Sequence, residues 1–245
     1  MRYAILSDIH GNIEALQAVL HDIESRGNVD YFWCLGDIVG YGPDPGPCID
    51  VVRQQNALCI AGNHDLASIG QIDVGDFNSD AAVACRWTAN NLSPDQTEYL
   101  ANLPHSIQEG DFTLAHGSPR EPIWEYILSA FSAYINFSYF DTLYCLVGHS
   151  HVPVVFKYLE GQTNCTFIEP HSGSTVNLCG ERLIINPGSI GQPRDGDPRA
   201  SYIIYNSDEH AIYYYRVAYN IAATQKKMTE SGLPPRLISR LDHGW

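Results

Sequence analysis

The first hundred residues alternate between short apolar runs and longer segments in which apolar residues recur at helical spacing. The apolar runs predict buried strands at residues 3–7, 31–35 and 57–61. The amphipathic segments predict helices at residues 12–25, 47–55, 79–91 and 93–103. Ser93 followed by Pro94 is typical of an N-cap and the first helical position. Strands that alternate with helices in this way favour right-handed crossovers and a parallel sheet.

The second half of the chain has a different pattern, in which strand-like runs follow one another with short turns between them. Gly110-Asp111 separates two such runs, 107–109 and 112–116, and predicts a hairpin. Further strands are predicted at residues 143–147, 152–159, 163–169, 182–185, 202–205 and 212–217, and a final helix at 220–231. No repeat, low-complexity tract or linker interrupts the pattern. We therefore expect one domain over residues 1–245, with two packed mixed sheets and helices outside them.

Residues 124–144 are rich in Trp, Phe and Tyr. We favour a surface helix or loop that this aromatic stripe holds against the core. The alternative is a wall on which a base or an aryl group of a substrate stacks.

Composition limits the classes of partner. The chain has 14 basic and 28 acidic residues, a formal net charge of −14. Binding a nucleic-acid polymer requires clustered Lys and Arg, so we do not expect one as a partner. The same deficit disfavours an anionic membrane surface, and no apolar run has the length of a membrane span.

The expected compartment follows from the N-terminus and the cysteines. The N-terminal apolar stretch is too short for a signal peptide. The seven cysteines include no Cys-x-x-Cys pair, and several lie in apolar runs, which indicates buried thiols in a reducing cytoplasm.

Five short polar blocks each follow a predicted strand directly. They occupy residues 8–12 (DIHGN), 36–37 (GD), 62–65 (GNHD), 116–117 (HG) and 148–151 (GHSH). Each block alone has an ordinary alternative, because Asp often caps a helix and Gly-Asp is a common turn. In an α/β sheet, however, strand ends on one edge converge on a single crevice. We therefore expect the five blocks to meet in space.

These blocks offer carboxylates, imidazoles and an amide oxygen, but no thiolate. Such a set disfavours structural zinc and suits Mn, Fe, Co, Ni or catalytic Zn. Seven ligands that include a carboxylate able to bridge suit two ions about 3.5–4 Å apart. We expect two divalent transition-metal ions, with manganese preferred.

The ordered set D-x-H, G-D, G-N-H-D, H and G-H-x-H resembles the calcineurin-like metallophosphoesterases. Within that superfamily the chain is similar to the small bacterial and archaeal phosphodiesterase branch, as are its segments 186–189 (NPGS) and 191–195 (GQPRD). The resemblance runs from Asp8 to about Ser189. It implies an α/β fold in four α-β-β-α layers, namely two mixed sheets flanked by helices.

The resemblance also implies roles for individual residues. Asp8, His10 and His151 would hold one metal ion, and Asn63, His116 and His149 the other. Asp37 would bridge the two ions, and the catalytic residues would be Asp37 and His64, with His64 facing the leaving group. Asn63 would also lie against the substrate.

Three departures from the protein-phosphatase branch bear on substrate choice. Gly40 and Tyr41 stand where that branch has an Asp that orients the catalytic His and an Arg that grips phosphate. Asp65 stands where that branch usually has Glu, and it could orient His64. The cation for the phosphate is therefore open, with Arg120 and Arg194 as candidates, and a surface ion pair is an equal alternative for each.

We expect hydrolysis of a phosphodiester by a metal-bridging hydroxide. The alternatives are a dinucleoside polyphosphate hydrolase, or a phosphomonoesterase or protein phosphatase, on the same site. A non-catalytic scaffold is disfavoured because none of the ligands is missing. The expected partner is a small, nucleotide-like phosphoester, and the sequence is compatible with an oligomer.

Overall fold

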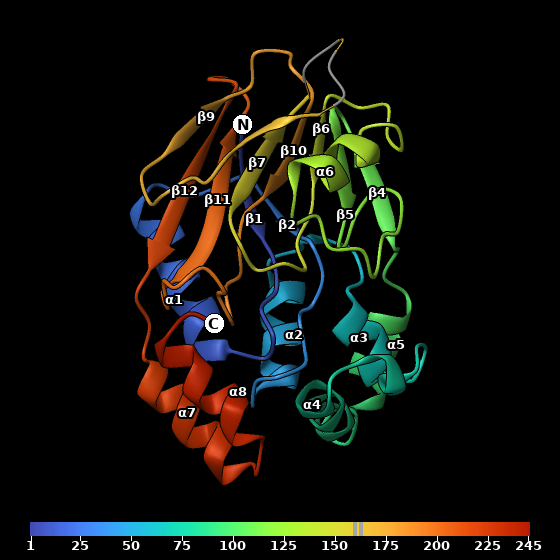
Figure 1. Cartoon of the computed structure of the whole chain (residues 1–245). Coiled ribbons are helices and arrows are strands. Elements are labelled where there is room, and N and C mark those ends of the chain that lie inside the picture. Colours follow the sequence, from blue (N-terminus) through green and yellow to red (C-terminus); the bar gives the residue numbers. More distant parts are fainter. Residues whose placement is uncertain (159–160, 162–163) are drawn as a thin grey trace.

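Two mixed sheets form the centre of the computed structural model, which describes residues 1–158, 161 and 164–245 (Figure 1). The first sheet has β1, β2 and β3 in parallel, and the remaining pairs in it are antiparallel. Its strands, in spatial order, are β3 (Leu58–Cys59), β2 (Tyr31–Cys34), β1 (Arg2–Leu6), β11 (Ala200–Asn206), β12 (Ala211–Val217) and β9 (Thr175–Asn177).

The second sheet begins with the predicted hairpin, because β4 and β5 pair antiparallel. β5, β6 and β10 are parallel, and β7 and β8 complete the sheet in antiparallel pairs. Its strands, in spatial order, are β4 (Ser106–Glu109), β5 (Phe112–Ala115), β6 (Tyr144–Leu146), β10 (Leu183–Asn186), β7 (Val154–Lys157) and β8 (Thr166–Ile168).

Alternation along the strands creates the layers. Ile5 of β1 and Ile185 of β10 belong to the apolar cluster between the two sheets. Leu6, on the other face of β1, belongs to the cluster that includes α1 (Ile13–Ser25) and α2 (Pro45–Gln54). Ile184, on the other face of β10, packs with residues of α6 (Ala130–Asn136). Because side chains alternate between faces with a period of two, each sheet buries both faces, and the four-layer α-β-β-α sandwich is confirmed.

Further helices cover one end of the two sheets (Figure 1). They are α3 (Asn63–Ser68), η1 (Val74–Asp76), α4 (Ser79–Ala89), α5 (Pro94–Ala101), α7 (Ile221–Glu230), α8 (Pro235–Ser239) and η2 (Arg240–Asp242). One apolar cluster includes Ala81 and Ala84 of α4 together with Met228 of α7 and Leu237 of α8. Helix α4, from the first half of the chain, and the C-terminal helices α7 and α8 therefore share a small apolar core at this end.

The predicted strands and long helices are confirmed, with ends that shift by at most three residues. Asn12 and Ser93 cap α1 and α5 through their side chains, as the local sequence suggests. The pattern did not predict α3, β9 or α8. Leu159, the last residue of one predicted strand, and Thr163, the first residue of the next, lie outside the described residues. Within the described part of the chain, no helix combines the length and apolar character that a bilayer crossing requires.

Candidate metal centre

The five polar blocks follow β1, β2, β3, β5 and β6 and meet at one end of the two sheets. Hydrogen bonds between main chains hold the blocks together. The amide of Asp8 donates to the Gly36 carbonyl at 3.1 Å, and the amide of His10 donates to the Asp37 carbonyl at 2.9 Å. The amide of Gly148 donates to the His116 carbonyl at 2.8 Å, which joins the two blocks of the second sheet.

All seven predicted ligands are buried. Their side-chain atoms form two groups, and each group could hold a metal ion. Within each group, all ligand atoms lie within 4.8 Å of one another. The first group is Asp8, His10, Asp37 and His151, and the second is Asp37, His116 and His149. Asn63 adjoins the second group, with its Oδ1 3.1 Å from His116 Nε2. The carboxylate common to both groups is that of Asp37.

The main chain is strained where these ligands sit. Asp8, His10, Asp37, His149 and His151 have φ angles between 50° and 63°. A non-glycine residue in this left-handed region costs roughly 1–3 kcal/mol, and such residues cluster at functional sites. The turns after the strands therefore adopt an unfavourable backbone conformation, and this conformation points the side chains inward.

The imidazole tautomers follow from main-chain contacts. Nδ1 lies 3.1 Å from the Val39 carbonyl in His10 and 2.6 Å from the Gln192 carbonyl in His151. A carbonyl oxygen only accepts, so in the neutral rings each Nδ1 carries the proton and each Nε2 presents a lone pair. The two Nε2 atoms lie 3.0 Å apart. Two lone pairs that face each other at this distance repel, and a bound cation would relieve that repulsion.

Two buried atoms of the cluster, Asp37 Oδ2 and His149 Nε2, have no hydrogen-bond partner among the described residues, and Nε2 of His116 and of His10 lie 3.3 and 3.5 Å from Asp37 Oδ2 at ion-pair distance. Burial by itself would lower the pKa of His116, but the carboxylate of Asp37 raises it to about 9. The cluster therefore favours positive charge at its centre. Divalent metal ions fit this cluster, because it has buried atoms without hydrogen-bond partners and imidazole lone pairs that face each other. Its potential ligand atoms are a mixture of oxygen and nitrogen, which such ions bind.

His64 lies beside this cluster, in the first turn of α3. Its amide donates to Asp37 Oδ1 at 2.8 Å, and its ring centroid is 4.8 Å from that of His10 and 4.3 Å from that of Tyr41. Burial lowers the pKa of His64 to about 4, against the attraction of Asp37. The ring is therefore neutral near pH 7 in the metal-free protein.

The thiol of Cys85 in α4 lies 3.3 Å from His64 Nδ1. Burial raises the pKa of Cys85 to about 12, so the thiol keeps its proton and can donate a hydrogen bond to Nδ1. With the thiol as donor, Nε2 is the ring nitrogen that carries hydrogen. Gly40 has a φ of +86°, and a Cβ there would lie 2.5 Å from His64 Nδ1, so this backbone has no room for an orienting Asp.

Asp65 does not orient His64, contrary to the expectation above. Its Oδ2 accepts from the Gly62 amide at 3.0 Å, and its Oδ1 accepts from the Val39 amide at 3.1 Å. Burial, and then the nearby charge of Asp37, raise the pKa of Asp65 to about 7. Its carboxyl group closes the start of α3 and ties that helix to the loop after β2.

The two candidate arginines have different surroundings. Arg120 forms an ion pair with Glu125, and its side chain is 37% exposed. Arg194 is partly buried, and its Nη2 donates to Tyr41 Oη at 3.3 Å and to Gln192 Oε1 at 3.1 Å. Among the described residues, no carboxylate lies within 4.0 Å of the Arg194 guanidinium. The unneutralised cation of the pair is therefore Arg194.

Tyr126 lies in the aromatic stretch, and its ring stacks on His149 with the centroids 3.8 Å apart. The stretch otherwise packs Phe137 and Phe140 against the second sheet, in keeping with the favoured interpretation. Sequence reasoning did not single out Tyr126, Cys85 or Gln192 as neighbours of the site. Tyr126 and Gln192 lie in segments that it noted, 124–144 and 191–195, whereas no motif marks Cys85.

Comparisons with known proteins identify the family of this chain. A model of the calcineurin-like phosphoesterase superfamily domain matches residues 1–210. Protein MJ0912 of Methanocaldococcus jannaschii is 39% identical over 245 residues, which cover 97% of this chain and 96% of that protein. The crystal structure of a metallophosphoesterase from Sphaerobacter thermophilus superposes with a TM-score of 0.91 at 46% identity and covers both chains completely. The expected resemblance is confirmed.

A more distant relative has a specific activity in its name. The symmetrical bis(5'-nucleosyl)-tetraphosphatase of Vibrio campbellii is 28% identical over 130 residues. That match covers 49% of this chain and 46% of the relative.

Proposed function

The chain belongs to the calcineurin-like phosphoesterase superfamily, and we propose that it hydrolyses phosphodiesters with two divalent transition-metal ions, preferably manganese. The observation that supports this most directly is the buried cluster of carboxylates and imidazoles around Asp37, in which Asp37 Oδ2 and His149 Nε2 have no hydrogen-bond partner among the described residues. Asp8, His10 and His151 would hold one ion, Asn63, His116 and His149 would hold the other, and Asp37 would contact both.

The ions would supply polarisation of the phosphoryl group and a water acidic enough to react near neutral pH. The protein residues contribute position and charge. Arg194 would donate to a phosphoryl oxygen, because its Nε has no acceptor among the described residues. His64, with hydrogen on Nε2, would donate to the leaving oxygen. Tyr41 and Tyr126 would limit water around the reacting group, because their rings cover the imidazoles.

Substrate charge favours diesters over monoesters. A diester carries one negative charge fewer than a monoester near neutral pH. Arg194 is one guanidinium, whereas the protein-phosphatase branch adds an Arg at the position that is Tyr41 here. We therefore propose a diester-type phosphoryl group in a small, nucleotide-like substrate. Seven free cysteines support a reducing, cytoplasmic location.

Metal removal and substrate comparison test this function together. A chelator should abolish hydrolysis of bis(p-nitrophenyl) phosphate, and Mn²⁺ should restore it. The restored protein should have a kcat/KM for this diester at least about tenfold above that for a phosphoserine peptide, equivalent to about 1.4 kcal/mol. Activity without any bound transition metal would contradict the metal requirement, and faster hydrolysis of the peptide would contradict the diester preference.

The two candidate arginines offer a matched pair. Arg194→Gln should lower kcat/KM about 10- to 100-fold, since hydrogen bonds to a charged group contribute about 1.5–3 kcal/mol. Arg120→Gln should change it by about twofold at most, because Arg120 is a partly exposed partner of Glu125. Steady-state kinetics on both variants, with metal content measured, decide the assignment. A larger loss for Arg120→Gln would reverse it.

A second candidate function is hydrolysis of dinucleoside polyphosphates. The observation in its favour is the similarity to the tetraphosphatase from Vibrio campbellii over half of this chain. The internal phosphates of such a molecule are also disubstituted and carry one charge each, so the same site could accept them.

A further inference from the structure

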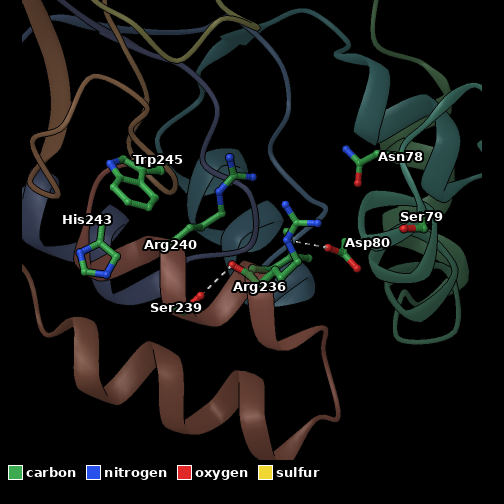
Figure 2. A pocket seen from close by; sticks show the side chains of 9 residues that line it. Asn78, Ser79, Asp80, Arg236, Ser239, Arg240, His243 and Trp245 are labelled. Atoms are coloured by element: carbon green, nitrogen blue, oxygen red, sulfur yellow. Dashed lines mark hydrogen bonds and ion pairs between the residues drawn. The ribbon is translucent and has the colours of Figure 1, made fainter.

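A cavity of about 590 Å³ lies between the start of α4 and the C-terminal segment (Figure 2). Its lining residues include Asn78, Asp80, Arg236, Arg240, His243 and Trp245. The last four of these follow residue 210, where the match to the family domain ends. Figure 2 shows Arg240 between Trp245 and Arg236, with Asp80 facing Arg236 from α4.

Arg240 connects this cavity to the cation at the metal centre. Its Nη1 donates to Gln192 Oε1 at 3.2 Å, and Arg194 Nη2 donates to the same oxygen at 3.1 Å. The main-chain carbonyl of Gln192 in turn lies 2.6 Å from Nδ1 of His151. One residue therefore touches a candidate metal ligand and both guanidiniums.

The two guanidiniums repel each other, and the carboxylates that act on them, Asp8 on Arg194 and Asp80 on Arg240, do so from beyond ion-pair distance. Among the described residues, no carboxylate lies within 4.0 Å of either Arg194 or Arg240. Asp80, the carboxylate that lines the cavity, lies 4.0 Å from Nε of Arg236. Burial, and then the charge of Arg194, lower the pKa of Arg240. Two unneutralised cations on one amide oxygen are unusual in a chain with a net charge of −14.

Unsatisfied donors lie at the same place. Nε of Arg194 and Nε2 of Gln192 are buried and have no acceptor among the described residues. The candidate metal centre next to them also has two buried atoms without a hydrogen-bond partner among the described residues, Asp37 Oδ2 and His149 Nε2. Metal cations would bind the unpartnered atoms of the candidate metal centre, and anionic oxygens would accept hydrogen bonds from the arginine pair.

We propose that the cavity beside Arg240 is a subsite for a second phosphate group of the substrate. The preferred substrates would then be nucleotide-like compounds with a phosphoanhydride chain, in which Arg194 contacts the scissile phosphoryl group and Arg240 the next phosphate. The exposed ring of Trp245 would lie beside the attached group. This inference rests on the proposed function, and it concerns only which disubstituted phosphoryl compound the site prefers.

The hydrolysis involved is a simple displacement. The oxygen of one water bonds to the scissile phosphorus, and the bond from that phosphorus to the bridging oxygen breaks. The bridging oxygen leaves on the second phosphate, and the two protons of the water are shared between the two products or released to solvent. No oxidant or reductant takes part.

The test compares two substrates in two arginine variants of the manganese-loaded protein. The substrates are a dinucleoside tetraphosphate and bis(p-nitrophenyl) phosphate. Arg240→Gln should lower the ratio of their kcat/KM values, tetraphosphate over diester, by about tenfold or more, the effect of one charged hydrogen bond. Arg53→Gln is the matched control, because Arg53 pairs with Asp95 on α5, and its ratio should stay within about twofold.

Binding gives a second readout. A methylene-bridged, non-hydrolysable dinucleoside tetraphosphate should bind Arg240→Gln at least about tenfold more weakly than the unaltered protein in calorimetry. Inorganic tripolyphosphate tests whether the phosphate chain alone is recognised. If Arg240→Gln weakens its binding as much as that of the analogue, Arg240 binds the phosphate chain. If the loss is smaller, the nucleoside also contributes to the contact.

The two levels of proposal fail in different ways. No hydrolysis of bis(p-nitrophenyl) phosphate by the unaltered, metal-loaded protein would overturn the proposed function. Hydrolysis of that diester, together with equal losses for both substrates in Arg240→Gln and unchanged binding of the analogue, would overturn only the second phosphate subsite.

Discussion

The Asp37→Asn protein should lose both metal ions and at least about a thousandfold in kcat/KM. Asp37 is the one carboxylate in both ligand groups, and its Oδ2 has no hydrogen-bond partner among the described residues. An amide is neutral and a weaker ligand, so the two sites lose their shared charge. Metal polarisation contributes several kcal/mol to such reactions, and each 1.36 kcal/mol is a factor of ten in rate. Elemental analysis and kinetics on the same sample measure both losses.

The substitution should leave the fold intact. Asn tolerates the left-handed conformation that Asp37 adopts, and its Oδ1 can still accept from the His64 amide. The metal-free variant should unfold at a lower temperature than the metal-free parent, because His116 loses the carboxylate that stabilises its charge. Asp50→Asn, an exposed carboxylate on α2, is the matched control and should keep metal and activity. Two ions retained by Asp37→Asn would refute the bridging role.

The second large effect is expected for His64→Ala, with full metal content retained. Loss of its hydrogen-bond donor should cost about 10²- to 10³-fold on an alkyl or nucleoside diester, as for other donors to developing oxyanions. A nitrophenolate leaves well without help, so the cost on a nitrophenyl ester should be clearly smaller. The ratio of kcat/KM values for the two esters, in parent and variant, measures this dependence.

Equal losses on both esters would show that His64 only contacts the phosphoryl oxygens. Variants of Cys85 refine the result, because this thiol lies 3.3 Å from Nδ1 of His64 and can donate a hydrogen bond to it. Cys85→Ala should weaken the alkyl-ester reaction about 3- to 10-fold, the effect of one neutral hydrogen bond, whereas Cys85→Ser keeps a donor and should restore most of it. The unfolding temperature of each variant separates this effect from a packing defect.

Much of the fold follows from local patterns. Apolar spacing identified the strands of both sheets except β9, and side-chain caps such as Asn12 and Ser93 act within their own first turn. β9 and α3 depend on distant partners instead. β9 pairs with β12, and α3 begins where Asp65 accepts amide protons from Gly62 and from Val39 in another loop. A pattern confined to one segment does not contain such partners.

The sequence by itself determined the family, the four layers and the convergence of five polar blocks, because strand ends of parallel sheets meet wherever the chain order places them. Only the tertiary structure decided which cation is free. Arg120 and Arg194 are equivalent in the sequence, but Glu125 neutralises the first and no carboxylate within 4.0 Å among the described residues neutralises the second. The tertiary structure also decided the contact between Cys85 and His64, and the hydrogen bonds that Arg194 and Arg240 both donate to Gln192 Oε1. Charge and hydrogen bonding act through space, and these residues become neighbours only when the chain has folded.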